Sequence, residues 1–260
     1  MPEGDMMDFS VAALASGTLV GFVLGLVGGG GSILATPLLL YVVGVASPHV
    51  AIGTGALAVA ASASLNVAGY VRRGLVRWRP ALSFAGLGVV GALAGSSLGK
   101  LVDGDQLLLA FGLLMAAVGV LMLRPRPVAR QADAASPRPQ WLLPVLAVLS
   151  GLASGFFGIG GGFLIVPALG LATGMPLIEA IAASLVSVTA FGLATSANYA
   201  LSGLIDWPIA GQFIVGGFVG GLGGTWLATY LSRFRRVLNL ILAGVILAAA
   251  GYVTYRAAYL

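Results

Sequence analysis

The chain has 260 residues, of which 59% are hydrophobic and only 8% are charged, with a formal net charge of +5. A soluble domain carries roughly a quarter charged residues, so this composition excludes a water-soluble globular protein and predicts one embedded in lipid. The apolar runs do not alternate with polar residues, which excludes a membrane β-barrel. The absence of cysteine excludes disulfides and thiolate chemistry.

Apolar segments recur along the whole chain, and about 20 apolar residues suffice to cross a hydrocarbon core. The first segment is expected to be retained as a span, because the residues before it include Glu3, Asp5 and Asp8 and no basic residue, unlike a secretory signal. The expected segments are 9–27, 32–45, 49–70, 80–101, 105–123, 141–157, 162–174, 177–201, 208–230 and 236–258.

A polar segment rich in proline and arginine, residues 124–140, separates the first five segments from the last five. Proline resists helix formation, so this segment is predicted to be a loop. It divides one integral membrane domain into an N-terminal membrane repeat, 1–123, and a C-terminal membrane repeat, 141–260.

The two halves resemble each other in sequence. The glycine-rich stretch GLVGGGGSILATP at 25–37 returns as GFFGIGGGFLIVP at 155–167, which is 130 positions later. A Gly-Trp-Pro corner at 74–80 likewise returns at 203–208 with one residue fewer. Several matches in the same order indicate an internal duplication.

Arginines predict the orientation of the halves. Arg72, Arg73, Arg77 and Arg79 place the first Gly-Trp-Pro corner in the cytoplasm, and the arginines of 124–140 place that linker there too. The second corner and the N-terminus lack basic residues and are expected on the outer side of the cell (inner) membrane. The repeats are therefore predicted to be inverted, as in many secondary transporters. Arginines spread over loops in this way do not predict a nucleic-acid partner.

These observations predict an all-α, polytopic membrane helical bundle with about 8–10 membrane segments. Segments 32–45 and 162–174 are short for a core about 30 Å thick. Each follows a glycine cluster, so broken or re-entrant helices are expected there, with the clusters near the middle of the membrane.

A glycine cluster at a helix start exposes backbone N–H groups near the positive end of the helix dipole, where anions bind. Thr54 matches Ser184 between the halves, and the amides of Asn66 and Asn198 are near-partners. The predicted substrate-binding residues are Gly29, Gly30, Gly31, Ser32, Thr54, Asn66, Gly160, Gly161, Gly162, Ser184 and Asn198. The alternative is that these glycines only permit tight packing and that the polar groups bond across helices.

His49 and Glu179 occupy matching positions 130 apart and are candidates for proton coupling or substrate contact; the alternative is a structural role at a helix start. Glycines spaced by four residues elsewhere, such as Gly17, Gly21 and Gly25, are interpreted as helix-packing contacts. The segments contain no aspartate pair and no histidine cluster, so neither an enzyme nor a metal or cofactor site is expected.

The doubled glycine-proline block, followed by Ala51–Thr54 or Ala180–Ser184 and then by Gly-x-x-x-Trp, resembles the TauE/SafE sulfite-exporter family from about Gly17 onward. The resemblance implies a permease for small sulfur-containing or organic anions such as sulfite, sulfonates or sulfoacetate.

The resulting hypothesis is a secondary transporter that works by alternating access around a site between the two repeats. Its partners would be a small anion and the lipid bilayer, and the sequence is compatible with a homo-oligomer. Two alternatives remain open. One is an anion channel, because backbone-lined constrictions also select ions, and the other is a membrane scaffold without transport activity.

Overall fold

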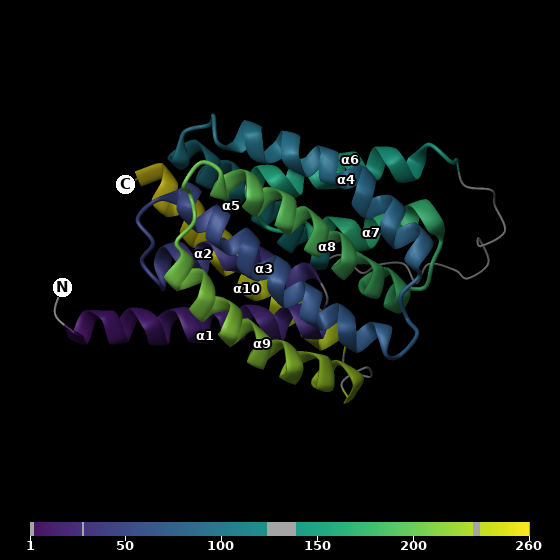
Figure 1. Ribbon diagram of the computed structural model, residues 1–260, viewed down its shortest axis with the longest axis horizontal. Helices are drawn as coiled ribbons and strands as arrows, with labels where there is room; N and C mark the ends of the chain where they lie inside the picture. The colour runs from purple at the N-terminus through teal and green to yellow at the C-terminus, as the bar shows by residue number, and fades with distance from the viewer. Residues whose placement is uncertain (1–2, 28, 124–138, 231–234, 260) are drawn as a thin grey trace.

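Helices make up the structure, and no strand occurs in the parts of the chain that the computed structural model describes, residues 3–27, 29–123, 139–230 and 235–259 (Figure 1). The predicted linker lies outside the described residues up to position 138, as do residues 231–234. The helices are α1 (Glu3–Val27), the 3-10 helix η1 (Gly29–Leu34), α2 (Ala35–Tyr41), α3 (Pro48–Val71), α4 (Trp78–Gly99), α5 (Gly104–Leu123), α6 (Leu142–Phe157), α7 (Gly162–Thr173), α8 (Leu177–Ala200), α9 (Trp207–Tyr230) and α10 (Arg235–Tyr259).

The helices have the length and surface of membrane spans. Among the described residues, four are long and apolar enough to cross a bilayer: Pro48–Val71, Trp78–Gly99, Gly104–Leu121 and Ile178–Ala200. Large apolar side chains point outward in the middle of helices, for example Val90, which is 66% exposed, and Val219, which is 60% exposed. Such a surface fits lipid rather than water. The predicted polytopic membrane bundle is confirmed.

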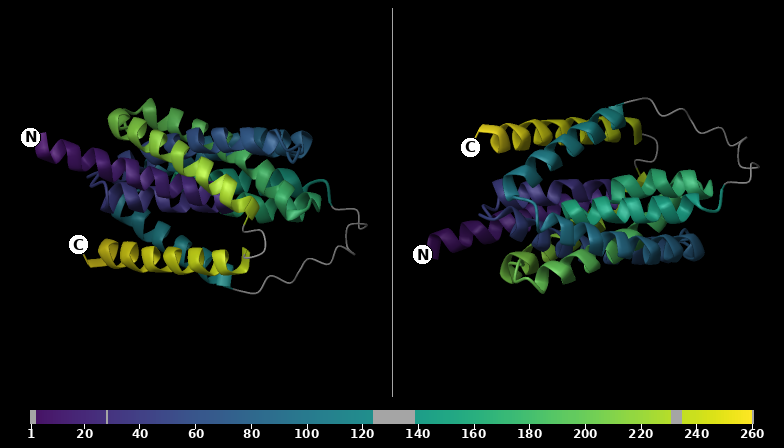
Figure 2. Two further views of the ribbon diagram at one scale, coloured as in Figure 1. Left: turned by 90° about the horizontal axis from the view of Figure 1, so that it is seen from below. Right: turned by 90° about the horizontal axis from the view of Figure 1, so that it is seen from above.

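Six helices form two groups that cross the boundary between the sequence halves. Helix α9 packs along α1 and against α3, and these three helices are called the α3 bundle. Helix α4 packs along α6 and against α8, and these three are called the α8 bundle. The two bundles meet where α3 contacts α8. Helices α5 and α10 pack against each other to one side, as both views of Figure 2 show.

Bare glycine surfaces hold the closest helix pairs together. A Cβ at Gly21 on α1 would overlap the carbonyl oxygen of Gly217 on α9, and a Cβ at Gly220 would overlap that of Thr18. The α4–α6 pair repeats the pattern, because a Cβ at Gly155 would overlap the carbonyl oxygen of Ala92. Small residues let backbones approach in this way, so the predicted packing role of the four-residue glycine ladders is confirmed.

The two glycine clusters adopt different backbones. The second is a loop, as predicted, with Gly158, Gly160 and Gly161 at φ near +65°. The first was expected to be a loop as well, but Gly29–Leu34 winds into η1 and continues directly into α2. The reason is close packing on α1, where a Cβ at Gly31 would lie 2.5 Å from the Leu24 backbone nitrogen. Both following helices are short, as their sequences predicted.

Candidate functional site

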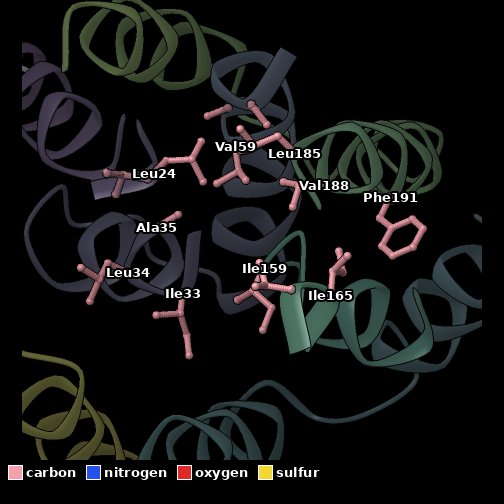
Figure 3. Packing of buried hydrophobic residues seen from close by; sticks show 14 of the residues in the cluster. Leu24, Ile33, Leu34, Ala35, Val59, Ile159, Ile165, Leu185, Val188 and Phe191 are labelled. Atoms are coloured by element: carbon pink, nitrogen blue, oxygen red, sulfur yellow. The ribbon is translucent and has the colours of Figure 1, made fainter. Parts of the chain in front are cut away.

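The two glycine-rich segments meet inside the molecule. Helix η1 contacts α7, although their sequences lie in different halves. Figure 3 shows Ile33 from η1 in one apolar cluster with Ile159 and Ile165 from the second segment, and all three side chains are fully buried. Water is therefore excluded around the junction, which strengthens any polar interaction made there.

The loop between α6 and α7 is wedged between α3 and α8. A Cβ at Gly160 would lie 2.9 Å from Cγ1 of Val188 on α8 and 3.1 Å from Cγ1 of Val59 on α3. A Cβ at Gly158 would overlap Ile52 on α3. Only glycine combines this contact with a positive φ at low cost. The loop therefore lies on the surface along which the two bundles face each other.

The N-terminus of α7 is the part of this junction with the features of an anion site. Gly161 is its N-cap, has φ of +64°, and provides no side-chain cap. The first N–H groups of a helix lack partners within the helix. Beside them lies Ser154 of α6, whose Oγ would be 3.2 Å from a Cβ at Gly161. Ser154 is fully buried, and its Oγ has no hydrogen-bond partner among the described residues.

Backbone N–H groups at a helix start and a buried hydroxyl are both donors that suit an oxyanion. An unsatisfied buried hydroxyl costs free energy unless a ligand or water takes up its bond. The start of α7 and Ser154 thus together offer hydrogen-bond donors for an oxyanion. No group of His, Cys, Asp or Glu side chains able to hold a metal occurs in the described chain.

The predicted glycines and Ser32 belong to the two segments that meet at this junction, but the predicted polar side chains bond elsewhere. Thr54 Oγ1 accepts the backbone N–H of Asp206 at 3.0 Å, just before α9. Ser184 Oγ donates to the carbonyl of Ile181 in its own helix at 2.8 Å. Both hydroxyls are fully buried. In this conformation they support helix packing.

The two asparagines face helices rather than the junction. Asn66 lies against α9, where its Oδ1 would be 2.8 Å from a Cβ at Gly221, and its Nδ2 has no partner among the described residues. Asn198 Nδ2 donates to Ser96 Oγ at 2.7 Å and to Ser97 Oγ at 3.0 Å on α4. Asn66 of α3 thus packs on α9, and Asn198 of α8 is hydrogen-bonded to α4.

Lys100, the single lysine of the chain, completes the contact between α4 and α8. Its Nζ donates to Oδ1 of Asn198 at 2.8 Å, to the Asn198 carbonyl at 3.1 Å and to Ser202 Oγ at 2.9 Å. Three oxygens surround the ammonium group, so its hydrogen-bond donors are satisfied by the protein. Lys100 therefore fastens the ends of α4 and α8 together.

Replacing Lys100 with methionine is expected to lower the free energy of unfolding by about 1–3 kcal/mol, the usual value of hydrogen bonds to a charged group. Methionine keeps an apolar stem and removes all three donors. Thermal unfolding in detergent measures the change. The matched control is Arg79→Met, because Arg79 is an exposed cation at the other end of α4. Equal melting temperatures for the two variants would contradict the fastening role.

The candidate coupling residues lie at helix starts and contact protein groups. His49, near the start of α3, has Nε2 3.1 Å from the carbonyl oxygen of Val102 and 3.3 Å from that of Gly99. Glu179, in the first turn of α8, forms an ion pair with Nε of Arg77. His49 thus joins α3 to the end of α4, whereas the ion pair joins the start of α4 to the start of α8.

Sequence reasoning missed Ser154 and Lys100. Ser154 precedes Gly158 by four residues, so it lies one helical turn before the loop and could have been placed near it. Lys100 was identifiable as the one lysine, at the end of an expected span. Neither residue type is distinctive there, because serines are common in these helices and a terminal lysine is usually solvated.

Comparison with known proteins identifies the chain's relatives. The family model for the sulfite exporter TauE/SafE matches residues 13–253. A "probable membrane transporter protein" of Xylella fastidiosa (strain 9a5c) is 55% identical over 248 residues, which cover 95% of each chain. The "probable membrane transporter protein YunE" of Bacillus subtilis (strain 168) is 28% identical over 233 residues, 81% of this chain and 85% of that one.

No solved structure matches the chain. The family and the relatives are membrane transporters rather than enzymes, so the predicted class is confirmed, and with the apolar helices they indicate a multi-pass membrane protein that handles a small-molecule substrate. The chain belongs to the sulfite exporter TauE/SafE family.

Proposed function

We propose that this protein is a secondary transporter for a small sulfur-containing or organic anion, such as sulfite, a sulfonate or sulfoacetate. The observation that carries the proposal is the N-terminus of α7, where backbone N–H groups and the unpartnered Ser154 hydroxyl lie beside the junction of the two glycine-rich segments. A dry surrounding of isoleucine and valine side chains strengthens hydrogen bonds to an anion there.

Inverted repeats bounded at 1–123 and 141–260 are supported by the way the helices pair. The duplication relates α1 to α6 and α4 to α9, so the α1–α9 contact corresponds to the α6–α4 contact. In the same way the α3–α9 contact corresponds to the α8–α4 contact. The matched glycines Gly44 and Gly174 both have positive φ, at 83° and 71°. Such a pseudo-twofold arrangement is a common basis of alternating access.

The moving parts in this proposal are the α3 bundle and the α8 bundle rather than the two sequence halves. Their contact includes one place with little side-chain bulk, because Gly192 on α8 faces Ala60 on α3, and a Cβ at Gly192 would lie 2.8 Å from the alanine Cβ. A hydrogen bond from His49 Nε2 to the carbonyl oxygen of Gly99, the last residue of α4, crosses between the bundles at one end. Rocking over the α3–α8 surface would open the junction first to one side and then to the other.

The proposed orientation in the cell (inner) membrane follows from charge. Arg72, Arg73, Arg77 and Arg79 gather around the turn between α3 and α4, which is therefore assigned to the cytoplasm. Arg77 and Glu179 then lie on the cytoplasmic side, whereas His49 and Lys100 lie on the outer side. The N-terminus is outside in this assignment.

Flux in proteoliposomes tests the proposal. Purified protein is expected to accelerate the entry of sulfite or a C2 sulfonate above protein-free vesicles, with saturation at high concentration as expected for a carrier. Ser154→Ala is expected to raise the substrate concentration for half-maximal flux about tenfold, which is the effect of one lost hydrogen bond to a charged ligand. Ser64→Ala, an exposed serine on α3, is the matched control.

The result also separates the alternatives. Non-saturating ionic current would indicate a channel, and the absence of flux for every anion tried would favour a scaffold. If the Ser154→Ala variant reaches half-maximal flux at the same substrate concentration as the parent, the α7 N-terminus is not part of the substrate site.

A further inference from the structure

Helices α2 and α10 end, and α5 begins, at one end of the molecule (Figure 1). A cavity lies there, away from the glycine junction. Its volume is about 320 Å³. Residues of α2, the α2–α3 loop, the start of α3, α5 and α10 line it, including Tyr41, Pro48, Asp105 and Arg256. The size is near the lower end of the range for small-molecule sites.

Arg256 is held in this cavity by aromatic rings. Its guanidinium carbon lies 5.8 Å from the ring centre of Tyr41 and 6.0 Å from that of Tyr252. The two rings themselves pack edge to face with centres 5.0 Å apart. Cation–π contacts restrain an arginine without neutralising its charge. The guanidinium donors therefore stay available to an anionic group.

Asp105 supplies the opposite charge from another wall. It lies in the first turn of α5 and lines the same cavity as Arg256. Within the described residues, no ion pair joins Asp105 to Arg256. Two exposed side chains of opposite charge thus share one small cavity without contacting each other.

We propose that this cavity binds a small zwitterion, with its anionic group on Arg256 and its ammonium group on Asp105. A simple anion would leave Asp105 as a repulsive neighbour, and a simple cation would meet Arg256 in the same way. A ligand that carries both charges a few atoms apart can pair with Arg256 and Asp105 at once. The inference goes beyond the proposed transport of an anion and does not depend on it.

This chemistry can come from two sources, a free amino-acid-like solute or the phosphoethanolamine headgroup of a lipid. Tyrosine and arginine also anchor helices at membrane surfaces. A plain anchor faces lipid and has no use for a carboxylate across a cavity. The presence of Asp105 therefore favours a bound zwitterion over anchoring alone.

Calorimetric titration of the full chain in detergent tests the proposal with defined probes. β-Alanine represents the free solute and glycerophosphoethanolamine the lipid headgroup, while propionate and propylamine carry only one of the two charges. We expect one or both zwitterions to bind, and propionate and propylamine to bind at least about tenfold more weakly, because each lacks one charged contact. Which zwitterion binds more tightly identifies the source.

Variants that remove one charge test whether Arg256 and Asp105 each bind the zwitterion. R256Q and D105N are each expected to weaken zwitterion binding about tenfold or more, whereas R256K retains part of the affinity. R79Q, an exposed arginine on α4, is the matched control and should bind as the parent does. Melting temperatures measured without ligand verify that the variants are folded.

Binding of neither zwitterion would overturn the proposal. So would equal binding of propionate, or affinity that survives both R256Q and D105N. Because the readout is binding and not flux, failure here leaves the proposed transport function untouched, and a failed flux experiment leaves this site untouched.

Discussion

Replacing Gly220 with leucine is expected to prevent stable folding, the largest effect of any single change considered. A Cβ at this position overlaps the backbone carbonyl oxygen of Thr18, and the next nearest atoms are also backbone. Backbone atoms cannot rotate away as a flexible side chain can, so α1 and α9 must separate. Overpacking of a well-packed contact usually costs about 1–3 kcal/mol, and an enforced helix separation exceeds that range.

The matched control for Gly220→Leu is Gly211→Leu on the same helix. Gly211 is exposed, and a Cβ there has no atom within 4 Å. Both variants change the intrinsic helix propensity alike, so the difference isolates the contact with α1. The yield of monodisperse protein in detergent and its melting temperature are the measurements. Similar values for the two variants would contradict a tight α1–α9 contact.

Replacing Gly161 with alanine is expected to abolish most transport while leaving a folded bundle. An alanine at φ of +64° costs about 1–2 kcal/mol, and its Cβ would lie 2.8 Å from the Ser154 Cβ. Relief of this contact displaces the start of α7 or the Ser154 side chain. Either shift disturbs the proposed hydrogen-bond donors. If one hydrogen bond to the substrate is lost, flux at low substrate concentration is expected to fall at least about tenfold.

Gly203→Ala separates backbone strain from the site in this experiment. Gly203 has φ of +70°, but a Cβ there meets nothing within 4 Å. It therefore shares the strain of Gly161→Ala without the steric contact. The expected result is a similar small loss of stability with flux retained. Equal losses of flux in both variants would indicate that strain, and not the contact with Ser154, causes the effect.

Most of the fold could be predicted because its determinants are local. Composition and span length indicated a helical membrane bundle, and the short segments after each glycine cluster indicated α2 and α7. The glycine ladders also predicted where backbones touch, because four-residue spacing places small residues on one helix face. The sequence did not show which helix each ladder would meet, so the pairing of α1 with α9 came only from the structure.

The candidate site was less predictable, for a physical reason. Hydroxyl and amide groups in apolar helices take whichever partner tertiary packing offers, and spacing does not reveal it. Thr54 was expected near the substrate, and in the structure its hydroxyl accepts a hydrogen bond from the backbone N–H of Asp206. Asn198 accepts a hydrogen bond from Lys100 and donates to Ser96 and Ser97. By contrast, the glycine segments were expected to converge from separate halves, and η1 does contact α7.

The division into an α3 bundle and an α8 bundle has a consequence for biosynthesis. The chain is made from its N-terminus, so α4, α6 and α8 can associate once α8 enters the membrane. The glycine face of α1, made first, has no α9 to cover it until nearly the whole chain has been synthesised. A chain that stops before α9 leaves that face uncovered and open to contact with other helices.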